Sequence, residues 1–313
     1  MHALFPQMEK AFLPMTAPKT ITLAAQPGCL SGLTWEQVCA AVQNHAEPAG
    51  PPDWLAPRTA CDWPAGEVDE EALSDALAPL QVDCAVHWQG ETRRKRVLIA
   101  DMDSTIVQGE TLDELAAEAG IKDRIAAITA RAMRGELDFA EALIERVAAL
   151  EGLDAAALER TLARTRIMPG AAELVATMRR NGATCWLVSG GFTEFTKPVA
   201  EWLGFTRQQG NTLKIENGKL TGHVVPPILE RNAKLEALQR AVTDAGTVPD
   251  NAVAVGDGAN DLAMIQAAGM GVAFQAKPAV RKAARFRVNH TDLRTPLYYQ
   301  GYRAAEIIAE ALQ

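Results

Sequence analysis

Three short apolar runs stand out along the chain, and each of them ends abruptly in polar residues. They lie at residues 97–100, 183–188 and 251–255, and they lack the alternation of a half-exposed strand. Such runs are typical of strands that are buried on both faces of a parallel sheet. The carboxyl ends of these strands form the ligand-binding edge of an open sheet. The pattern therefore predicts an α/β fold with a site at that edge.

A long helical segment separates the first two strands. Apolar residues recur with a helical period over 111–119, 122–133, 139–150 and 155–164, and glycines separate these stretches. An all-helical insertion at about 111–168 predicts a lid over the carboxyl ends of the strands. From periodicity alone, Met133 and Phe139 are expected in the core of this region. Glu110 and Arg146 are expected on its surface.

The segment between the second and third strands predicts a helix, a hairpin and another helix. Pro198 is expected to start or kink the first helix, because a proline cannot donate a backbone hydrogen bond. The sequence Asn217-Gly218 favours a tight turn between strands at 212–215 and 219–223. The second helix is expected at 232–242.

Residues 1–94 follow a different pattern and predict a small α+β domain. After a mobile arm at 1–19, strands are expected at 21–25 and 82–88, with helices from Thr34 and near 70–78. A proline-rich connection joins the two helices. Its prolines are Pro48, Pro51, Pro52, Pro57 and Pro64. The role of this domain stays open between packing or dimerisation and ligand sensing.

The basic run at 93–96 marks the boundary to a second domain at 95–313. A solvated linker face is favoured over a nucleic-acid patch, because the chain as a whole is acidic, with a formal charge of -8 and a pI of about 5.3. This charge argues against general binding of nucleic acid or of membrane surfaces. No apolar run is long enough to span a membrane and no signal peptide is evident, so a cytoplasmic location is expected.

Cysteine and histidine usage excludes two further classes of site. The five cysteines are odd in number and widely spaced, which favours reduced thiols over a disulfide framework. The five histidines form no close pair, so a zinc site is not expected.

Candidate chemistry begins at the end of the first strand, where Asp101 and Asp103 follow the apolar run. Residues i and i+2 of an extended backbone point to the same side, so both carboxylates are expected to face one small volume. Crowded carboxylates repel one another unless a cation or a shared proton neutralises them. The alternative is a helix cap, because Asp, Ser and Thr are common at that position.

The other two strands also end in candidate site residues. Ser189 and Gly190 follow the second strand, where glycine allows close approach of an anion to the backbone. Asp257, bracketed by glycines, follows the third strand and is expected to point toward Asp101. The sequence leaves two roles open for Asp261, a helix cap and a site residue.

Together the three strand ends predict a phosphate site with a metal. Asp101 and Asp257 offer the oxygen ligands that Mg²⁺ prefers. Ser189, the Gly190 N–H and Lys234 are expected to hold phosphate oxygens, so that a carboxylate can attack phosphorus.

The chain resembles the haloacid dehalogenase-like phosphatases over roughly residues 95–305. The motifs that carry the resemblance are Asp-x-Asp-Ser-Thr at 101–105, Ser-Gly-Gly at 189–191, Lys234, and Gly-Asp-Gly-x-Asn-Asp at 256–261. The resemblance implies a Rossmann-like core with an inserted helical cap. It also implies that Asp101 is the nucleophile and Asp103 the general acid, and that Mg²⁺ binds to Asp101, Asp257 and the backbone carbonyl of Asp103.

Within this family the resemblance is to enzymes that hydrolyse phosphoserine at the last step of serine biosynthesis. It implies that Glu110 pairs with the substrate ammonium, that Arg146 grips the carboxylate, and that Asn260 lies beside the phosphate. Met133 and Phe139 would supply apolar contacts from the lid. Transfer of the phosphoryl group to another alcohol, another amino-acid phosphate as substrate, and a non-enzymatic sensor remain alternatives. A homodimer is possible.

Overall fold

The computed structural model describes residues 18–229 and 232–309, which form two sheets with helices packed against them. The predicted mobile arm at 1–19 therefore lies almost entirely outside the described residues. Within these residues, no helix combines the length and the apolar character that a membrane crossing requires.

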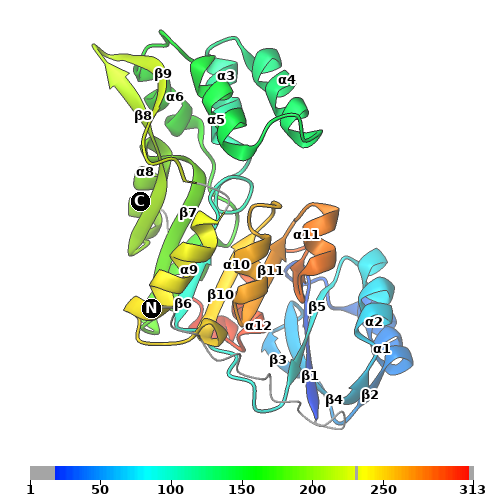
Figure 1. Cartoon of the computed structure of the whole chain (residues 1–313). Helices are drawn as coiled ribbons and strands as arrows, with labels where there is room; N and C mark the ends of the chain where they lie inside the picture. Colours follow the sequence, from blue (N-terminus) through cyan, green and yellow to red (C-terminus); the bar gives the residue numbers. More distant parts are fainter. Residues whose placement is uncertain (1–17, 230–231, 310–313) are drawn as a thin grey trace, which may run out of the picture.

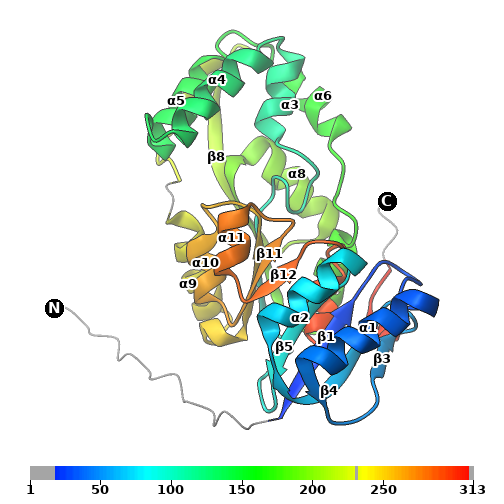
Figure 2. The same cartoon turned by 90° about the vertical axis from the view of Figure 1, so that its right-hand side faces the viewer.

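The first sheet has five strands, all paired antiparallel, with β3 beside β4 and the others in the order β2-β4-β1-β5. Helices α1 and α2 lie together on one face of it (Figure 2). The elements are β1 (Lys19–Ala24), α1 (Gly32–His45), β2 (Ala46–Pro48), β3 (Asp53–Ala56), β4 (Ala60–Val68), α2 (Glu70–Leu77) and β5 (Asp83–Trp88).

The prediction of an irregular proline-rich connection was wrong, because β2, β3 and most of β4 lie in it. The register of β2 against β4 shifts next to Pro48, so this proline lies at an irregular part of an edge strand. Pro64 lies inside β4 and accepts a hydrogen bond from the N–H of Ala49 at 2.8 Å. A proline is compatible with a strand where the ladder does not require its missing N–H.

The second sheet has seven strands in the order β12-β11-β10-β6-β7-β8-β9, and all neighbours are parallel except β8 and β9. This confirms the predicted α/β class. Its strands are β6 (Val97–Ala100), β7 (Thr184–Phe192), β8 (Arg207–Glu216), β9 (Lys219–Val225), β10 (Ala252–Gly256), β11 (Met270–Phe274) and β12 (Phe286–Val288). The helices around it are α7 (Ala171–Arg180), α8 (Thr193–Leu203), α9 (Ala233–Asp244), α10 (Leu262–Ala267), α11 (Pro278–Ala283) and α12 (Thr295–Tyr299).

Strand β6 is buried on both faces, as its unbroken apolar sequence predicts. Leu98 and Ala100 belong to the apolar cluster that contains α7 and α8 residues, whereas Val97 and Ile99 belong to the cluster with α9. Alternate side chains of a strand point to opposite faces, so each face of β6 contributes to a separate core. Because both faces are packed, the position of β6 in the sheet is fixed, and so is the position of its carboxyl end.

The helical insertion between β6 and β7 stands apart from the sheet, at the top of Figure 1. It contains α3 (Thr111–Glu118), α4 (Lys122–Met133), α5 (Phe139–Ala148) and α6 (Ala156–Arg164), each within two residues of the prediction. The β8–β9 hairpin runs beside α5. Its turn residues Asn217 and Gly218 have φ values of 50° and 74°, as a tight hairpin turn requires.

One helix boundary differs from the prediction. Pro198 does not start α8, which begins at Thr193 and continues through the proline to Leu203. The other half of that prediction, a kink at Pro198, stays a prediction. Inside a helix a proline lacks one N–H donor and its ring crowds the preceding turn, and the buried face of α8 outweighs this cost. That face includes Phe195, Val199 and Leu203.

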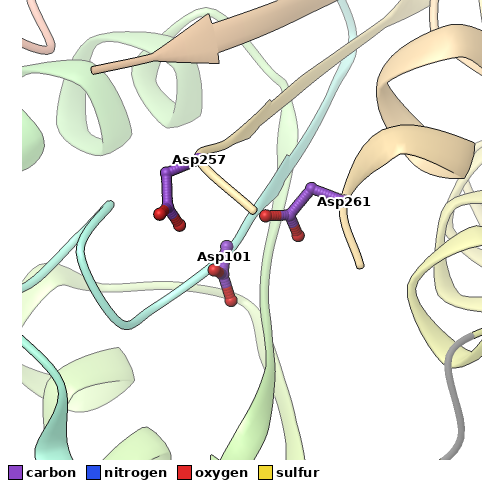
Figure 3. A group of neighbouring side chains, drawn as sticks. All are labelled: Asp101, Asp257 and Asp261. Carbon is purple, nitrogen blue, oxygen red and sulfur yellow. The ribbon is translucent and has the colours of Figure 1, made fainter. Parts of the chain in front are cut away.

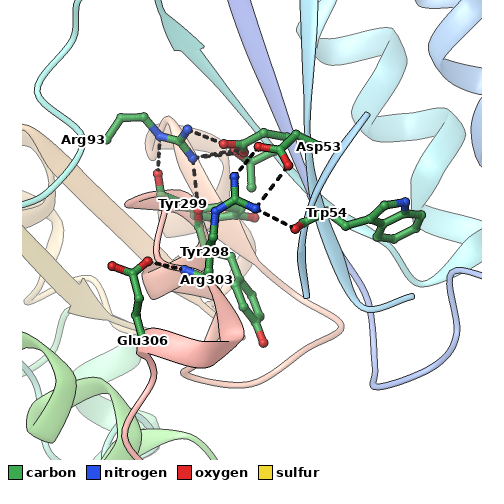
Figure 4. A network of polar contacts seen from close by, with 9 residues as sticks. Asp53, Trp54, Arg93, Tyr298, Tyr299, Arg303 and Glu306 are labelled. Atoms are coloured by element: carbon green, nitrogen blue, oxygen red, sulfur yellow. Dashed lines mark hydrogen bonds and ion pairs between the residues drawn. The ribbon is translucent and has the colours of Figure 1, made fainter. Parts of the chain in front are cut away.

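The basic run at 93–96 is not a solvated linker face throughout, so this prediction was wrong for two of its residues. The Arg93 side chain donates to Asp62 at 2.6 Å and to the backbone carbonyls of Tyr298 and Tyr299 (Figure 4). Lys95 is buried and donates to the backbone carbonyls of Thr92 and Asp250. The sequence pattern alone does not reveal these contacts.

These contacts connect the two sheets. Beside them, Arg303 pairs with Asp53 from β3 (Figure 4). Asp83 from β5 is buried and accepts hydrogen bonds from the backbone N–H groups of Asn289 and Thr291. Buried charged groups with several partners fix one relative arrangement of the two parts.

His87 is a buried histidine at the junction between the sheets. Its ring stacks on Phe286 at 5.4 Å, and neither ring nitrogen has a hydrogen-bond partner among the described residues. Burial, with help from nearby cations, lowers its pKa to about 2. The fold therefore requires the neutral ring, whereas the unfolded chain binds a proton below the usual value of 6.5.

Replacing His87 with Phe is expected to raise the free energy of unfolding by about 1–3 kcal/mol, because two unpaired polar atoms leave the core. Between pH 7.5 and pH 5, the free energy of unfolding should fall by about 2 kcal/mol more in the wild type than in this variant. The reason is that only the unfolded wild type gains a proton on His87 in this range. Urea unfolding at both pH values measures this difference. The variant His223→Gln, which removes an exposed histidine, serves as the control. Equal acid sensitivity of wild type and His87→Phe would contradict the role of His87.

Candidate active site

The carboxyl ends of three neighbouring strands meet at one edge of the larger sheet. Asp101 directly follows β6, Asp257 directly follows β10, and Ser189 lies in β7 just beyond its pairing with β6. The strands β10, β6 and β7 are adjacent in the sheet. The parallel pairing therefore brings the three predicted strand ends together.

Asp101, Asp257 and Asp261 form a compact acidic group (Figure 3). Each of these buried side chains offers a carboxylate oxygen, and the three oxygens lie within 4.8 Å of one another. Three close carboxylates in a buried site repel one another strongly unless a cation lies among them. Their oxygens are ligands of the kind that hard divalent cations prefer. This donor set fits a divalent metal ion.

Lys234 neutralises part of this negative charge. Its Nζ atom lies 2.6 Å from Asp101 Oδ1 and 2.5 Å from Asp261 Oδ1, and the lysine is buried. Burial alone would lower the pKa of Lys234, but the two carboxylates outweigh this effect and raise it. The lysine is therefore a permanent cation at the base of the site.

Asp261 is not the helix cap that the sequence left open. It precedes α10, but its side chain accepts no capping hydrogen bond from that helix. Its two oxygens instead accept from Lys234 and from the N–H of Gly258. A Cβ at position 256 would collide with the Asp261 carboxyl group, which explains the glycine there. Asp261 is thus a site residue that the sequence did not distinguish from a cap.

Asp103 lies in the same cavity as Asp101, as expected, but it has different partners. Its Oδ1 accepts from the Thr111 N–H at 2.7 Å, and its Oδ2 accepts from Ser189 Oγ at 3.1 Å. Asp103 therefore faces the cavity, as the site interpretation predicts. It also accepts from the first N–H of α3, but the residue at the N-cap position of that helix is Glu110. Burial raises the pKa of Asp103, and the bond from Thr111 opposes this only in part.

A cavity of about 510 Å³ lies between the strand ends and the helical insertion. A smaller one adjoins it. All but one of the predicted site residues line these cavities. Lys234 lines the smaller cavity, and the larger one is lined by Asp101, Asp103, Glu110, Phe139, Arg146, Ser189, Gly190, Asp257 and Asn260. The exception is Met133, the last residue of α4, whose side chain lies outside what the structure describes.

Glu110 and Arg146 bring opposite charges to the lid side of the cavity. Glu110 accepts from Ser104 Oγ at 3.0 Å, and burial together with the negative charge of Asp103 raises its pKa to about 7. Arg146 is half-buried and donates to the backbone carbonyl of Ala142 at 3.2 Å. No carboxylate of the described residues lies within 4.0 Å of its guanidinium group. Arg146 therefore keeps donors for a ligand.

Two further residues at the site were not singled out from the sequence. Thr111 holds Asp103 through its backbone N–H, which no side-chain pattern reveals. Lys277 lines the cavity beside Asp257, although it lies 20 positions later in the chain. Only the parallel pairing of β10 with β11 brings Lys277 close to Asp257.

Comparison with known proteins agrees with this fold and site. The sequence model of the haloacid dehalogenase-like hydrolases matches residues 98–266, which is more than half of the chain. The chain belongs to the haloacid dehalogenase-like hydrolase family. This confirms the family expected from the motifs.

Individual relatives carry more specific names. The phosphoserine phosphatase of Streptomyces coelicolor is 46% identical over 258 residues, which cover 81% of this chain and 63% of that protein. The chain spans only 58–63% of the length of three such relatives.

Two solved structures are also similar. The probable phosphoserine phosphatase from Vibrio cholerae, in its unliganded form, has a TM-score of 0.76 and 29% identity, and covers 93% of this chain and 88% of its own. A phospho-aspartyl intermediate analogue of phosphoserine phosphatase has a TM-score of 0.62 and 38% identity, over 66% of this chain and 99% of its own.

Proposed function

We propose that this protein hydrolyses O-phospho-L-serine to L-serine and phosphate through an aspartyl-phosphate on Asp101. The observation that carries the proposal is one cavity that combines a buried carboxylate cluster with a free arginine and a glutamate on the lid. The names of the similar proteins support it, and so does the phospho-aspartyl analogue in one of them. Such an activity would belong to the last step of serine biosynthesis.

The proposed metal is Mg²⁺, held by the carboxylates of Asp101, Asp257 and Asp261, with the backbone carbonyl of Asp103 as the ligand that the family resemblance implies. When bound, Mg²⁺ would supply positive charge that offsets the repulsion between Asp101 and the phosphoryl oxygens. The acidic group fits this cation because all three side chains offer oxygen.

The chain's own residues position the phosphate. Ser189 and Gly190 line both cavities, Lys234 lines the smaller one, and the Lys234 Nζ atom lies 2.6 Å from Asp101 Oδ1. Together with Asn260, these groups offer donors to the non-bridging oxygens, where negative charge must be stabilised during phosphoryl transfer. Asp101 then attacks phosphorus in line with the leaving serine oxygen.

Asp103 acts as the acid in the first step and as the base in the second. Its raised pKa favours the protonated carboxyl group, which can donate to the serine oxygen as the P–O bond breaks. The resulting carboxylate then takes a proton from the water that attacks the aspartyl-phosphate. The hydrogen bonds from Thr111 and Ser189 hold Asp103 in place for both transfers.

Selectivity for an amino-acid phosphate would come from the lid. Glu110 would pair with the ammonium group and Arg146 with the carboxylate of the substrate, whereas Phe139 and Met133 would cover its apolar part. An arginine can bind a carboxylate through two parallel hydrogen bonds, which fixes the orientation of the substrate.

Replacing Arg146 with Ala tests the proposed substrate. We expect kcat/KM for phosphoserine to fall by about 10²-fold, because a charge-assisted pair with the carboxylate is lost. The value for phosphoethanolamine, which lacks the carboxylate, should change by less than about three-fold. Arg131→Ala on α4, whose exposed side chain already pairs with Glu145, is the control. An equal loss for both substrates would refute this role of Arg146.

We also propose the division into an α+β domain at 1–94 and a phosphatase domain at 95–313, with a cap at about 111–168. The separate apolar cluster of the first sheet, which includes Ile21 and Leu73, supports this division. The cytoplasmic location and the homodimer remain predictions.

A further inference from the structure

The charges around the larger cavity are unequal. Its ionisable lining residues, among the part of the chain that the structure describes, are five carboxylic acids and two cations. The acids are Asp101, Asp103, Glu110, Asp138 and Asp257, and the cations are Arg146 and Lys277. A phosphomonoester carries up to two negative charges near neutral pH, so the lining carboxylates oppose its entry, whereas the two lining cations and Lys234 beside Asp101 favour it.

The two cations lie on opposite sides of the cavity. Arg146 belongs to α5 of the lid, whereas Lys277 directly precedes α11 of the core. In Figure 1, α11 lies at the end of the larger sheet that faces the helical insertion. Lys277 is thus the cation on the core side, and its side chain is 61% exposed. An exposed ammonium group is accessible to an arriving anion.

The backbone of Lys277 is held firmly although its side chain reaches solvent. Its N–H donates to the backbone carbonyl of Asp257 at 3.1 Å, and its own carbonyl accepts from Val280 and Arg281. Pro278 follows immediately and restricts the chain at the start of α11. The Lys277 Nζ atom lies 3.9 Å from Asp257 Oδ2. This distance is at the limit of an ion pair, so the ammonium group is not committed to Asp257.

We propose that Lys277 is a further substrate-binding residue, which attracts the anionic phosphate of the substrate into the acid-lined cavity. The proposal rests on the proposed function in one respect, namely that the substrate is a phosphomonoester. A placed cation at the mouth of a cavity raises the rate of association with an anion, and salt weakens this effect by screening.

The test compares Lys277→Met with the wild type at saturating Mg²⁺ over a range of NaCl concentrations. At low salt, kcat/KM for phosphoserine should fall by about five- to ten-fold while kcat changes by less than about two-fold. The decline of kcat/KM with rising salt should become shallower in the variant. Lys277→Arg should restore both properties. Lys282→Met, on an exposed position of the same helix, should behave as the wild type.

A second measurement does not depend on turnover. The dissociation constant of inorganic phosphate, measured by calorimetry with Mg²⁺ present, should rise by about three- to ten-fold in Lys277→Met and should not change in Lys282→Met. A merely structural role of Lys277 would instead lower the melting temperature and leave the salt dependence unchanged.

Two results would overturn the proposal: an unchanged salt dependence, or a loss confined to kcat. In each case the wild type still hydrolyses phosphoserine, so the proposed function survives. A wild type that neither hydrolyses any phosphomonoester nor binds inorganic phosphate would overturn both.

Discussion

The variant Asp101→Asn should lose hydrolysis of phosphoserine by roughly 10⁴-fold or more, because an amide cannot serve as the nucleophile that forms the aspartyl-phosphate. Asn has almost the same volume, and Lys234 keeps its ion pair with Asp261, so the fold should persist. Initial rates of phosphate release measure the loss. Circular dichroism and the melting temperature report whether the variant remains folded.

Asp75→Asn is a matched control for this variant. Asp75 is exposed on α2 and lies outside the cavity, so its amide should leave the rate unchanged. Phosphate release by folded Asp101→Asn at the wild-type rate would show that another group attacks phosphorus.

The variant Asp103→Asn should separate the two steps of the reaction. With phosphoserine we expect kcat to fall by about 10²–10⁴-fold, because no group protonates the serine oxygen as it leaves. With p-nitrophenyl phosphate the leaving phenolate needs no proton, so the first step should stay fast. The second step should be slow, since the base for water is missing. Rapid mixing should therefore show a burst of p-nitrophenol followed by a slow steady rate.

The amide at position 103 can preserve the local structure, which makes this variant informative. Its oxygen can still accept from the Thr111 N–H, and its NH₂ group can donate to Ser189 Oγ. The absence of a burst, with equal losses for both substrates, would contradict the role of Asp103 as acid and base. A change in melting temperature of several degrees would reveal a structural cause instead.

The sequence predicts the edge of the sheet that carries the candidate site well, because strong local patterns coincide there. Val97 to Ala100 are buried on both faces, so their apolar run and its abrupt end in Asp101 mark the strand and the site together. The Asn217-Gly218 turn is similarly local, since its positive φ values favour these residue types.

The errors have a common physical cause, because each depends on contacts between distant parts of the chain. Pro64 remains in β4 because neighbouring strands do not need its N–H, and Arg93 is drawn into the junction by Asp62 and two carbonyls. Asp261 resembles a cap until the position of Lys234 is known. Lys277 approaches Asp257 only once the order of strands is set.

The most direct test of the account is to identify the phosphorylated residue. The wild type would be mixed with phosphoserine and Mg²⁺, quenched in acid within the first turnovers, digested, and analysed by mass spectrometry. We predict a phosphoryl group on Asp101 that is absent from Asp101→Asn. In Asp103→Asn this group should accumulate when p-nitrophenyl phosphate replaces phosphoserine, because the first step then needs no acid. A phosphoryl group on any other side chain, or rapid hydrolysis with the Asp101 peptide unmodified in both wild type and Asp103→Asn, would contradict the proposed mechanism.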